Sequence, residues 1–216
     1  MERGPSGTIA RLCSSPEEVA VLRRELLCRA AVAYERAREW GEAASCWQET
    51  GQPERAAEAF ARAGEPMTAA RLLMRSGNHA AALPHFETVA DDFLWSGFDR
   101  VGALLGIAAC HLTISGMTSK AFLTVGQPAA QEARRILTDA RHRTDAAAAQ
   151  AWALLGDYGR VANRYDLVQQ GYETALAHGR LALPAAECRS IREAYLAAAR
   201  EAGDTLLASH IAAEAA

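Results

Sequence analysis

Small and bulky apolar residues recur every thirteen positions between about Arg38 and Val89. Alignment of Gly51, Gly64 and Gly77 brings small side chains into one pair of columns and a bulky side chain into another. The small pairs are Ala43-Ala44, Ala56-Ala57, Ala69-Ala70 and Ala82-Leu83, and the bulky residues are Trp47, Phe60, Leu73 and Phe86. A short fixed period of this kind is typical of repeated structural units that stack on their neighbours.

Each unit predicts one short helix. Gly51-Gln52-Pro53 leads into residues 54–63, and Gly64-Glu65-Pro66 leads into residues 67–76. Glycine ends a helix in the left-handed conformation, and proline is tolerated in the first turn of the next helix. A ten-residue helix is about 15 Å long and is marginal alone in water. The small pair and the bulky residue share one helical face, which predicts close packing of consecutive helices in two-unit hairpins.

The unit 54–64 resembles the short helical hairpins of tetratricopeptide-like α-solenoids, including those of vesicle-coat and intraflagellar-transport subunits. The resemblance covers about residues 38–97. A second match to the tetratricopeptide consensus lies downstream, at Trp152, Leu155, Gly156, Tyr172 and Ala175. Gly159 and Arg180 depart from it, because the consensus has Tyr and Pro at those positions. The resemblance implies an all-α fold, namely a right-handed α-solenoid of stacked antiparallel helical hairpins.

The rest of the chain also reads as helices. Ser15-Pro16-Glu17-Glu18 is a capping box, and it opens a long helix with an apolar stripe at Val19, Leu22, Leu26, Ala30, Ala33, Ala37 and Trp40. Further helices are predicted at 79–95, 99–114, 128–143, 144–156, 157–179, 184–202 and 204–215, with an interruption at 115–120 and an ambiguous stretch at 121–127. In the longest helix, the stripe is Val161, Tyr165, Val168, Tyr172, Ala175 and Gly179. Thr144 and Asp204 are predicted N-caps, and Gly156, Gly179 and Gly203 are predicted helix ends.

These elements predict a flexible N-terminus over residues 1–14 and a single α-helical repeat module over 15–216. Within the module, short-helix repeats occupy 38–97 and longer tetratricopeptide-like helices occupy 98–216. Trp40 and Trp47 fit the repeat columns, and we expect both in the core.

The composition of the chain argues against two classes of protein, nucleic-acid binders and membrane-spanning proteins. The formal net charge of -3 lacks the basic excess of a typical nucleic-acid binder, which argues against that class. The five cysteines are odd in number and show no Cys-x-x-Cys pair, which predicts small core residues in a reducing compartment, the cytoplasm. We find no run of 18 apolar residues, and we expect no membrane span.

No zinc-protease, phosphate-loop or dinucleotide-binding motif occurs in the sequence. We therefore predict no enzyme activity, no cofactor and no metal site. Two sets of residues are candidates for binding a protein. Trp95, Phe98 and Phe122 flank breaks in the helical pattern and could form an exposed contact patch, the alternative being core packing at the junction. Arg134, Arg135, Arg141 and Arg143 form the densest basic patch, the alternative being a solvated helix face.

The sequence thus favours a non-enzymatic protein–protein interaction scaffold or adaptor, part of a larger assembly, with a protein partner and with possible stacking through the C-terminal helix. The alternative is a regulatory or sensor arm that contacts nucleic acid or an acidic ligand through the basic patch.

Overall fold

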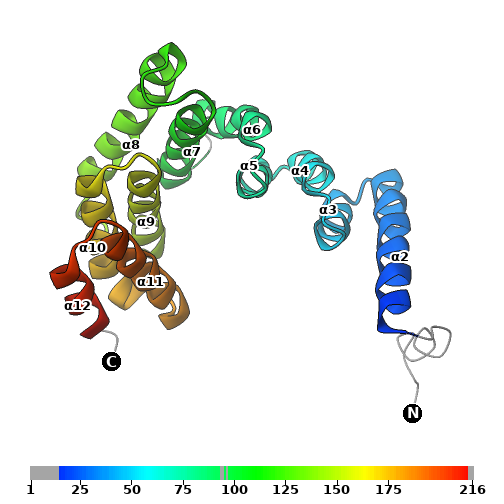
Figure 1. Cartoon of the computed structure of the whole chain (residues 1–216). Helices are drawn as coiled ribbons and strands as arrows, with labels where there is room; N and C mark the ends of the chain where they lie inside the picture. The colour runs from blue at the N-terminus through cyan, green and yellow to red at the C-terminus, as the bar shows by residue number, and fades with distance from the viewer. Residues whose placement is uncertain (1–14, 93–94, 96, 214–216) are drawn as a thin grey trace. The chain divides into compact units, whose positions relative to one another are not determined.

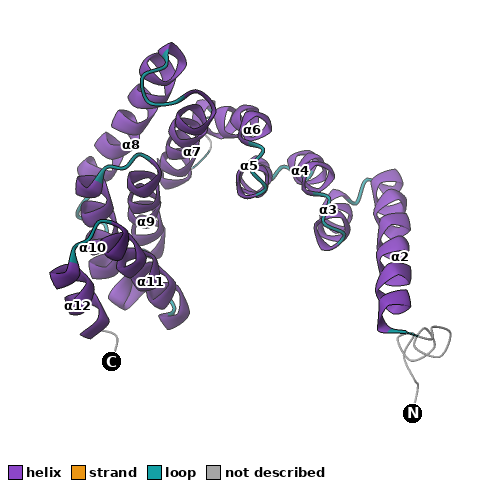
Figure 2. Cartoon of the chain, viewed as in Figure 1, coloured by secondary structure: helices purple, strands orange, loops and turns teal. Residues whose placement is uncertain are grey.

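The computed structural model describes residues 15–92, 95 and 97–213. Within these ranges every regular element is a helix and no strand is present (Figure 1, Figure 2), which confirms the all-α prediction. The helices are α2 (Pro16–Ala37), α3 (Trp40–Glu49), α4 (Pro53–Arg62), α5 (Pro66–Arg75), α6 (His79–Asp91), α7 (Gly97–Ser115), the π-helix η1 (Phe122–Gly126), α8 (Gln127–Asp139), α9 (Ala146–Val161), α10 (Tyr165–Ala182), α11 (Ala185–Glu201) and α12 (Thr205–Ala213).

The chain forms two compact units, residues 1–77 and 78–216. The first contains α2 to α5 and the second contains α6 to α12. The single module predicted for residues 15–216 therefore stays a prediction. The N-terminal segment 1–14 lies outside the described residues.

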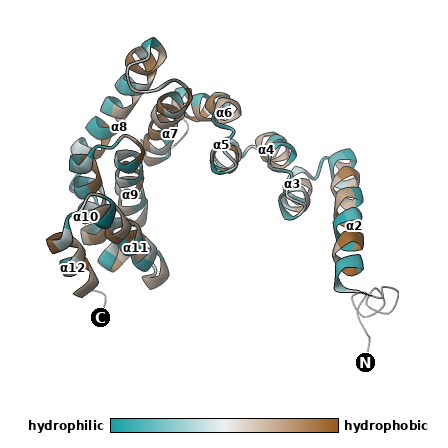
Figure 3. Ribbon diagram, viewed as in Figure 1, coloured by the Kyte–Doolittle hydropathy of each residue, from teal (hydrophilic) through white to brown (hydrophobic). Residues whose placement is uncertain are grey.

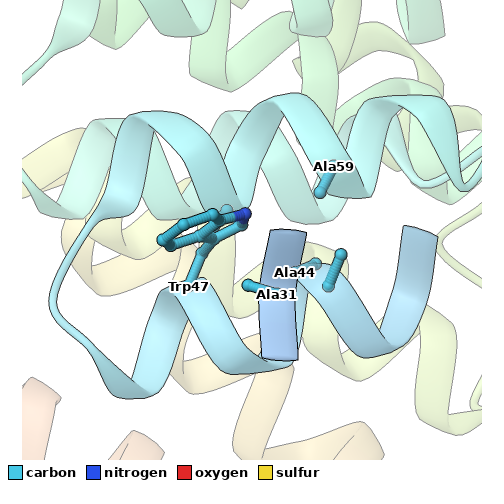
Figure 4. Packing of buried hydrophobic residues seen from close by; sticks show 6 residues of the cluster. Ala31, Ala44, Trp47 and Ala59 are labelled. Atoms are coloured by element: carbon cyan, nitrogen blue, oxygen red, sulfur yellow. The ribbon is translucent and has the colours of Figure 1, made fainter. Parts of the chain in front are cut away.

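In the first unit, each helix packs on the next. Both members of the pairs at 43–44, 56–57 and 69–70 are buried, as are Trp47 and Leu73, while Phe60 is half-buried. Figure 4 shows Trp47 together with Ala31, Ala44 and Ala59, which belong to the same buried cluster. Small side chains let the helix axes approach, and the bulky residue fills the remaining gap. The predicted column of small pairs is confirmed in this unit, and the column of bulky residues is confirmed at Trp47 and Leu73 but only in part at Phe60.

Helix α2 begins as predicted, because Ser15 and Glu18 form both hydrogen bonds of the capping box. Its buried face differs from the predicted stripe. Ala31 is fully buried, whereas Ala33 and Ala37 are exposed. The face that packs on the core instead carries Cys28, Ala31, Val32 and Tyr34. Arg38 has a left-handed backbone (φ 62°), and the chain turns there into α3. Trp40 therefore starts a new helix and is half-buried, so its predicted place in the core is not fully met.

Helix α7 is the core helix of the second unit. Every residue from Val101 to Ala108 is buried, and α7 contacts α6, η1, α8 and α9. Figure 3 shows both hydrophobic and hydrophilic residues along the helices of this unit. Among the described helices, α7 alone is long and apolar enough to cross a membrane by length and composition, a test that buried core helices also pass. Its ten buried residues account for its composition.

Helices α9 and α10 form the tightest pair, and two predicted helix ends are wrong here. Helix α9 continues through Gly156 to Val161, and α10 continues through Gly179 to Ala182. Gly156 does not end α9. A Cβ added at this position would lie 2.8 Å from the Tyr172 ring, so the glycine makes room for that ring. Val161, which the predicted stripe buries, is 53% exposed.

Of the two predicted N-caps, one is wrong and one is confirmed. The predicted cap Thr144 is wrong by one residue, because the Asp145 carboxylate accepts the Ala148 N–H at 2.9 Å. Asp204 is confirmed as an N-cap, since its carboxylate accepts the Leu207 N–H at 3.0 Å, directly after the left-handed Gly203. The predicted interruption after Ser115 is also confirmed.

Candidate functional site

A groove of about 480 Å³ lies between α2, α3 and α4 of the first unit. Three arginines line the groove: Arg29 and Arg36 lie in α2, and Arg55 lies in the first turn of α4. Its other lining residues are Cys28, Val32, Trp47 and Gln52. The described lining thus combines three guanidinium groups with an indole ring and carries no carboxylate.

The floor of the groove is fixed by hydrogen bonds around Trp47. The indole Nε1–H donates to a Glu35 carboxylate oxygen at 2.7 Å, and the Trp47 carbonyl accepts from the buried Thr50 hydroxyl at 3.0 Å. The Arg55 guanidinium lies over the indole ring, 3.5 Å from its centroid. A cation over an indole face is attracted by the ring quadrupole, so Arg55 is held with its N–H groups beside the groove.

The three arginines differ in the ion pairs that they form with carboxylates of the chain. Arg29 pairs with Glu25 at 2.5 Å, and Arg55 approaches Glu35 only to 3.9 Å. Arg36 is exposed and forms no ion pair with a described residue. Exposed ion pairs contribute only about 0–1 kcal/mol each. An incoming anionic group can therefore exchange with Glu25 or Glu35 at low cost and can bind Arg36 without any exchange.

The spacing along α2 gives the groove a direction. Arg29 and Arg36 are seven residues apart, which is two helical turns, or about 10.5 Å along the axis. Val32 lies between them on the same side and offers apolar contact. The arrangement suits an extended segment that carries acidic groups about 10 Å apart.

A second arginine–tryptophan pair continues the same face of the hairpin. Arg62, seven residues after Arg55, lies over the Trp40 ring at 4.8 Å from the centroid. Arg62 also pairs with Glu58 at 2.5 Å. Because Trp40 and Trp47 are likewise seven residues apart, two cation–π contacts cross the antiparallel α3–α4 pair. They stabilise the hairpin that carries the groove.

The aromatic residues predicted as a contact patch lie in the second unit and are mostly buried there. Phe98 is 8% exposed and Phe122 is 5% exposed, so their rings pack inside the unit and leave little surface for a partner. The alternative of core packing holds for these two. Arg143 lies over the Phe98 ring at 4.8 Å, and Phe122 packs against Gly126. Trp95 is half-buried.

The predicted basic patch is divided by its own carboxylates. Arg135 pairs with Glu132 at 2.7 Å and with Asp139 at 3.0 Å. The hydrogen bond from Arg135 lowers the pKa of Glu132. Arg143 bonds Asp145, whose pKa is lowered by the Ala148 backbone N–H and by Arg143. Only Arg134 and Arg141 remain exposed without an ion pair to a described residue, so the patch offers half the charge that the sequence suggests.

In the described part of the chain, no group of three or more His, Cys, Asp or Glu residues is placed to hold an ion. Four cysteines in that part, at 28, 46, 110 and 188, are free thiols.

In comparisons with protein-family models, curated proteins and solved structures, no match to this chain was found. Sequence reasoning missed the groove because Trp47 and Arg55 occupy different columns of the repeat. The recurring seven-residue spacing of Trp40 and Trp47, and of Arg55 and Arg62, is a signal that could have indicated it.

Proposed function

We propose that this chain is a non-enzymatic, cytoplasmic interaction scaffold or adaptor in a larger assembly, and that the groove of the first unit holds an acidic segment of a partner protein. The observation that carries the proposal is the groove lining: Arg29, Arg36 and Arg55 around the Trp47 ring, with no carboxylate among the described lining residues. Arginine binds carboxylates through paired, charge-assisted hydrogen bonds. An aromatic floor adds apolar contact for the side chains between the acids.

The finer fold belongs to the same proposal. Within each unit we infer tetratricopeptide-like antiparallel hairpins that follow a right-handed superhelical path. The resemblance at Trp152, Gly156 and Tyr172 supports this, and so does the contact between Gly156 and the Tyr172 ring. Helical-repeat proteins generally present their extended surfaces to protein segments.

The spacing of the arginines predicts the spacing of the acids. A peptide in the extended polyproline II conformation rises about 3.1 Å per residue and has three residues per turn, so acids three residues apart lie on one face and match the separation of Arg29 and Arg36. We expect a peptide with glutamates at positions i and i+3 to bind more tightly than one of equal charge with adjacent glutamates. Affinity falls with added salt, because the contacts are largely exposed ion pairs.

Fluorescence polarisation with these two labelled peptides and the full chain tests the proposal. Arg36→Ala removes an exposed side chain, so the fold is retained, and we expect binding of the i, i+3 peptide to weaken about tenfold. The matched control is Arg134→Ala with Arg141→Ala, which leaves the groove intact. If instead the control abolishes binding and Arg36→Ala does not, the alternative of a regulatory arm acting through the basic patch is favoured. Equal affinity for a lysine peptide would exclude both.

A further inference from the structure

The turn that joins α7 to η1 in the second unit presents an unusual surface. Four large aliphatic side chains around it are about half exposed, namely Ile114, Met117, Leu123 and Val125, at 43–50%. The segment leads from α7 toward α8 in Figure 1. Ser115 and Ser119 hydroxyls lie 2.7 Å apart across the turn, and Leu123 N–H donates to the Ser119 carbonyl at 3.0 Å. All four side chains therefore come from one short stretch of chain, residues 114–125, around a single turn.

The same segment carries no acidic residue. From Val101 to Gln131 the sequence contains neither Asp nor Glu, and its one Lys or Arg residue is the exposed Lys120, beside the turn. The chain as a whole has 26 acids in 216 residues, so about four are expected in a stretch of this length. The burial of α7 explains part of this lack of acidic residues, but the turn itself is exposed and also lacks carboxylates.

Hydroxyl groups at the turn are bonded back to the chain. Thr113 donates to the Ala109 carbonyl at 2.9 Å, Ser115 to the His111 carbonyl at 2.7 Å, and Thr124 to the Lys120 carbonyl at 2.8 Å. The Ser119 hydroxyl accepts the Phe122 N–H at 3.0 Å. These polar groups can leave water without losing their hydrogen bonds, which is what an apolar environment demands.

We propose that this turn docks on an anionic lipid surface. The aliphatic side chains enter the boundary between headgroups and acyl chains, and Lys120 extends back to the anionic headgroups. A charge pattern with one lysine and no carboxylate matches a negatively charged bilayer surface and avoids repulsion from it. The site is independent of the arginine groove, which lies in the other unit.

Vesicle co-sedimentation of the full chain tests this. One set of vesicles contains phosphatidylcholine alone, and the other contains phosphatidylcholine mixed with phosphatidylserine. We expect binding to the mixed vesicles, and Met117→Asp with Leu123→Asp weakens it about tenfold or more, since two apolar side chains are lost from the contact. Lys120→Gln reduces the preference for phosphatidylserine. All three positions are exposed, so folding is retained.

The matched control is Leu181→Asp, the same change at a 99% exposed leucine of α10 away from the turn. It should bind vesicles like the unaltered chain. A chain that stays in the supernatant with both vesicle types overturns the proposal, as does an equal loss on Leu181→Asp. If vesicles do not bind but Met117→Asp abolishes self-association in sedimentation equilibrium, the turn is a protein interface and the lipid assignment is wrong.

Discussion

Substitution of Gly171 by alanine tests the close approach of the α9 and α10 backbones. A Cβ at this position would lie 2.3 Å from the Gly156 nitrogen, 2.7 Å from the Gly156 Cα and 2.8 Å from the Trp152 carbonyl oxygen. All three atoms belong to the backbone of α9, so no side-chain rotation relieves the clash. Helices α9 and α10 must move apart, and the packing between them is loosened.

The magnitude follows from two opposing effects. Overpacking of a rigid contact costs about 3 kcal/mol, while replacing a helical glycine by alanine returns about 1 kcal/mol of helix propensity. We expect a net loss of about 2 kcal/mol in the free energy of unfolding of the second unit, or roughly 8 °C in its Tm. Gly41→Ala is the matched control, because Gly41 lies in α3 with nothing within 4 Å of the added Cβ. It should stabilise the chain by up to about 1 kcal/mol.

Chemical denaturation followed by far-UV circular dichroism gives the free energies, and hydrogen exchange with mass spectrometry locates the change. Faster exchange in the peptides of α9 and α10, with unchanged exchange in α3, is the expected result for Gly171→Ala. If Gly171→Ala is neutral or stabilising, the two backbones are not in contact and the hairpin packing derived from the small residues is wrong.

Three further predictions concern buried groups. Burial, and then hydrogen bonds from their hydroxyls to carboxylates, raise the pKa values of Tyr172 and Tyr195 above 10. The contribution of the two tyrosines to stability is therefore complete below about pH 10 and is lost as the pH rises further. The pH midpoint of alkaline unfolding should shift when both are changed to Phe. Trp47→Phe removes the indole donor to Glu35 and should cost about 2 kcal/mol of unfolding free energy in urea titration; a neutral result would mean that this bond is not made. Burial raises the pKa of Cys110 to about 11, so iodoacetamide should label it only in the unfolded chain, as peptide mass spectrometry would show.

The repeat period was enough to predict the short helices α3, α4 and α5 of the first unit. The pattern of small pairs followed by a bulky residue reports packing directly, because only small side chains allow close approach, and Ala57, Ala70 and Leu73 are buried as predicted. Capping residues were informative where one chemistry dominates, as at Ser15 and Asp204.

Glycine has two structural roles in this chain, and the sequence alone does not distinguish them. Gly203 ends a helix with a left-handed backbone, whereas Gly156 and Gly179 lie inside helices and make room for Tyr172 and Leu183. Only the partner's position distinguishes the two uses. The boundaries at Gly156 and Gly179 were wrong for this reason.

The candidate site depended even more on tertiary contacts. Arg55 and Trp47 belong to different helices, and their stacking exists only once α3 and α4 pair. The aromatic residues that flank breaks in the pattern were more informative about packing than about surface, since Phe98 and Phe122 fill the second unit. Ion pairs likewise reduced the basic patch, because Glu132 and Asp139 on the same helix neutralise Arg135.

The most direct test of the arginine groove is a ¹⁵N–¹H spectrum of the full chain titrated with the peptide that carries glutamates at i and i+3. The account predicts saturable shifts of the Trp47 indole N–H and of the Nε–H signals of Arg29, Arg36 and Arg55, with Arg134 and Arg141 unchanged. Shifts at Arg134 and Arg141 alone, or equal shifts at every exposed arginine, would contradict it.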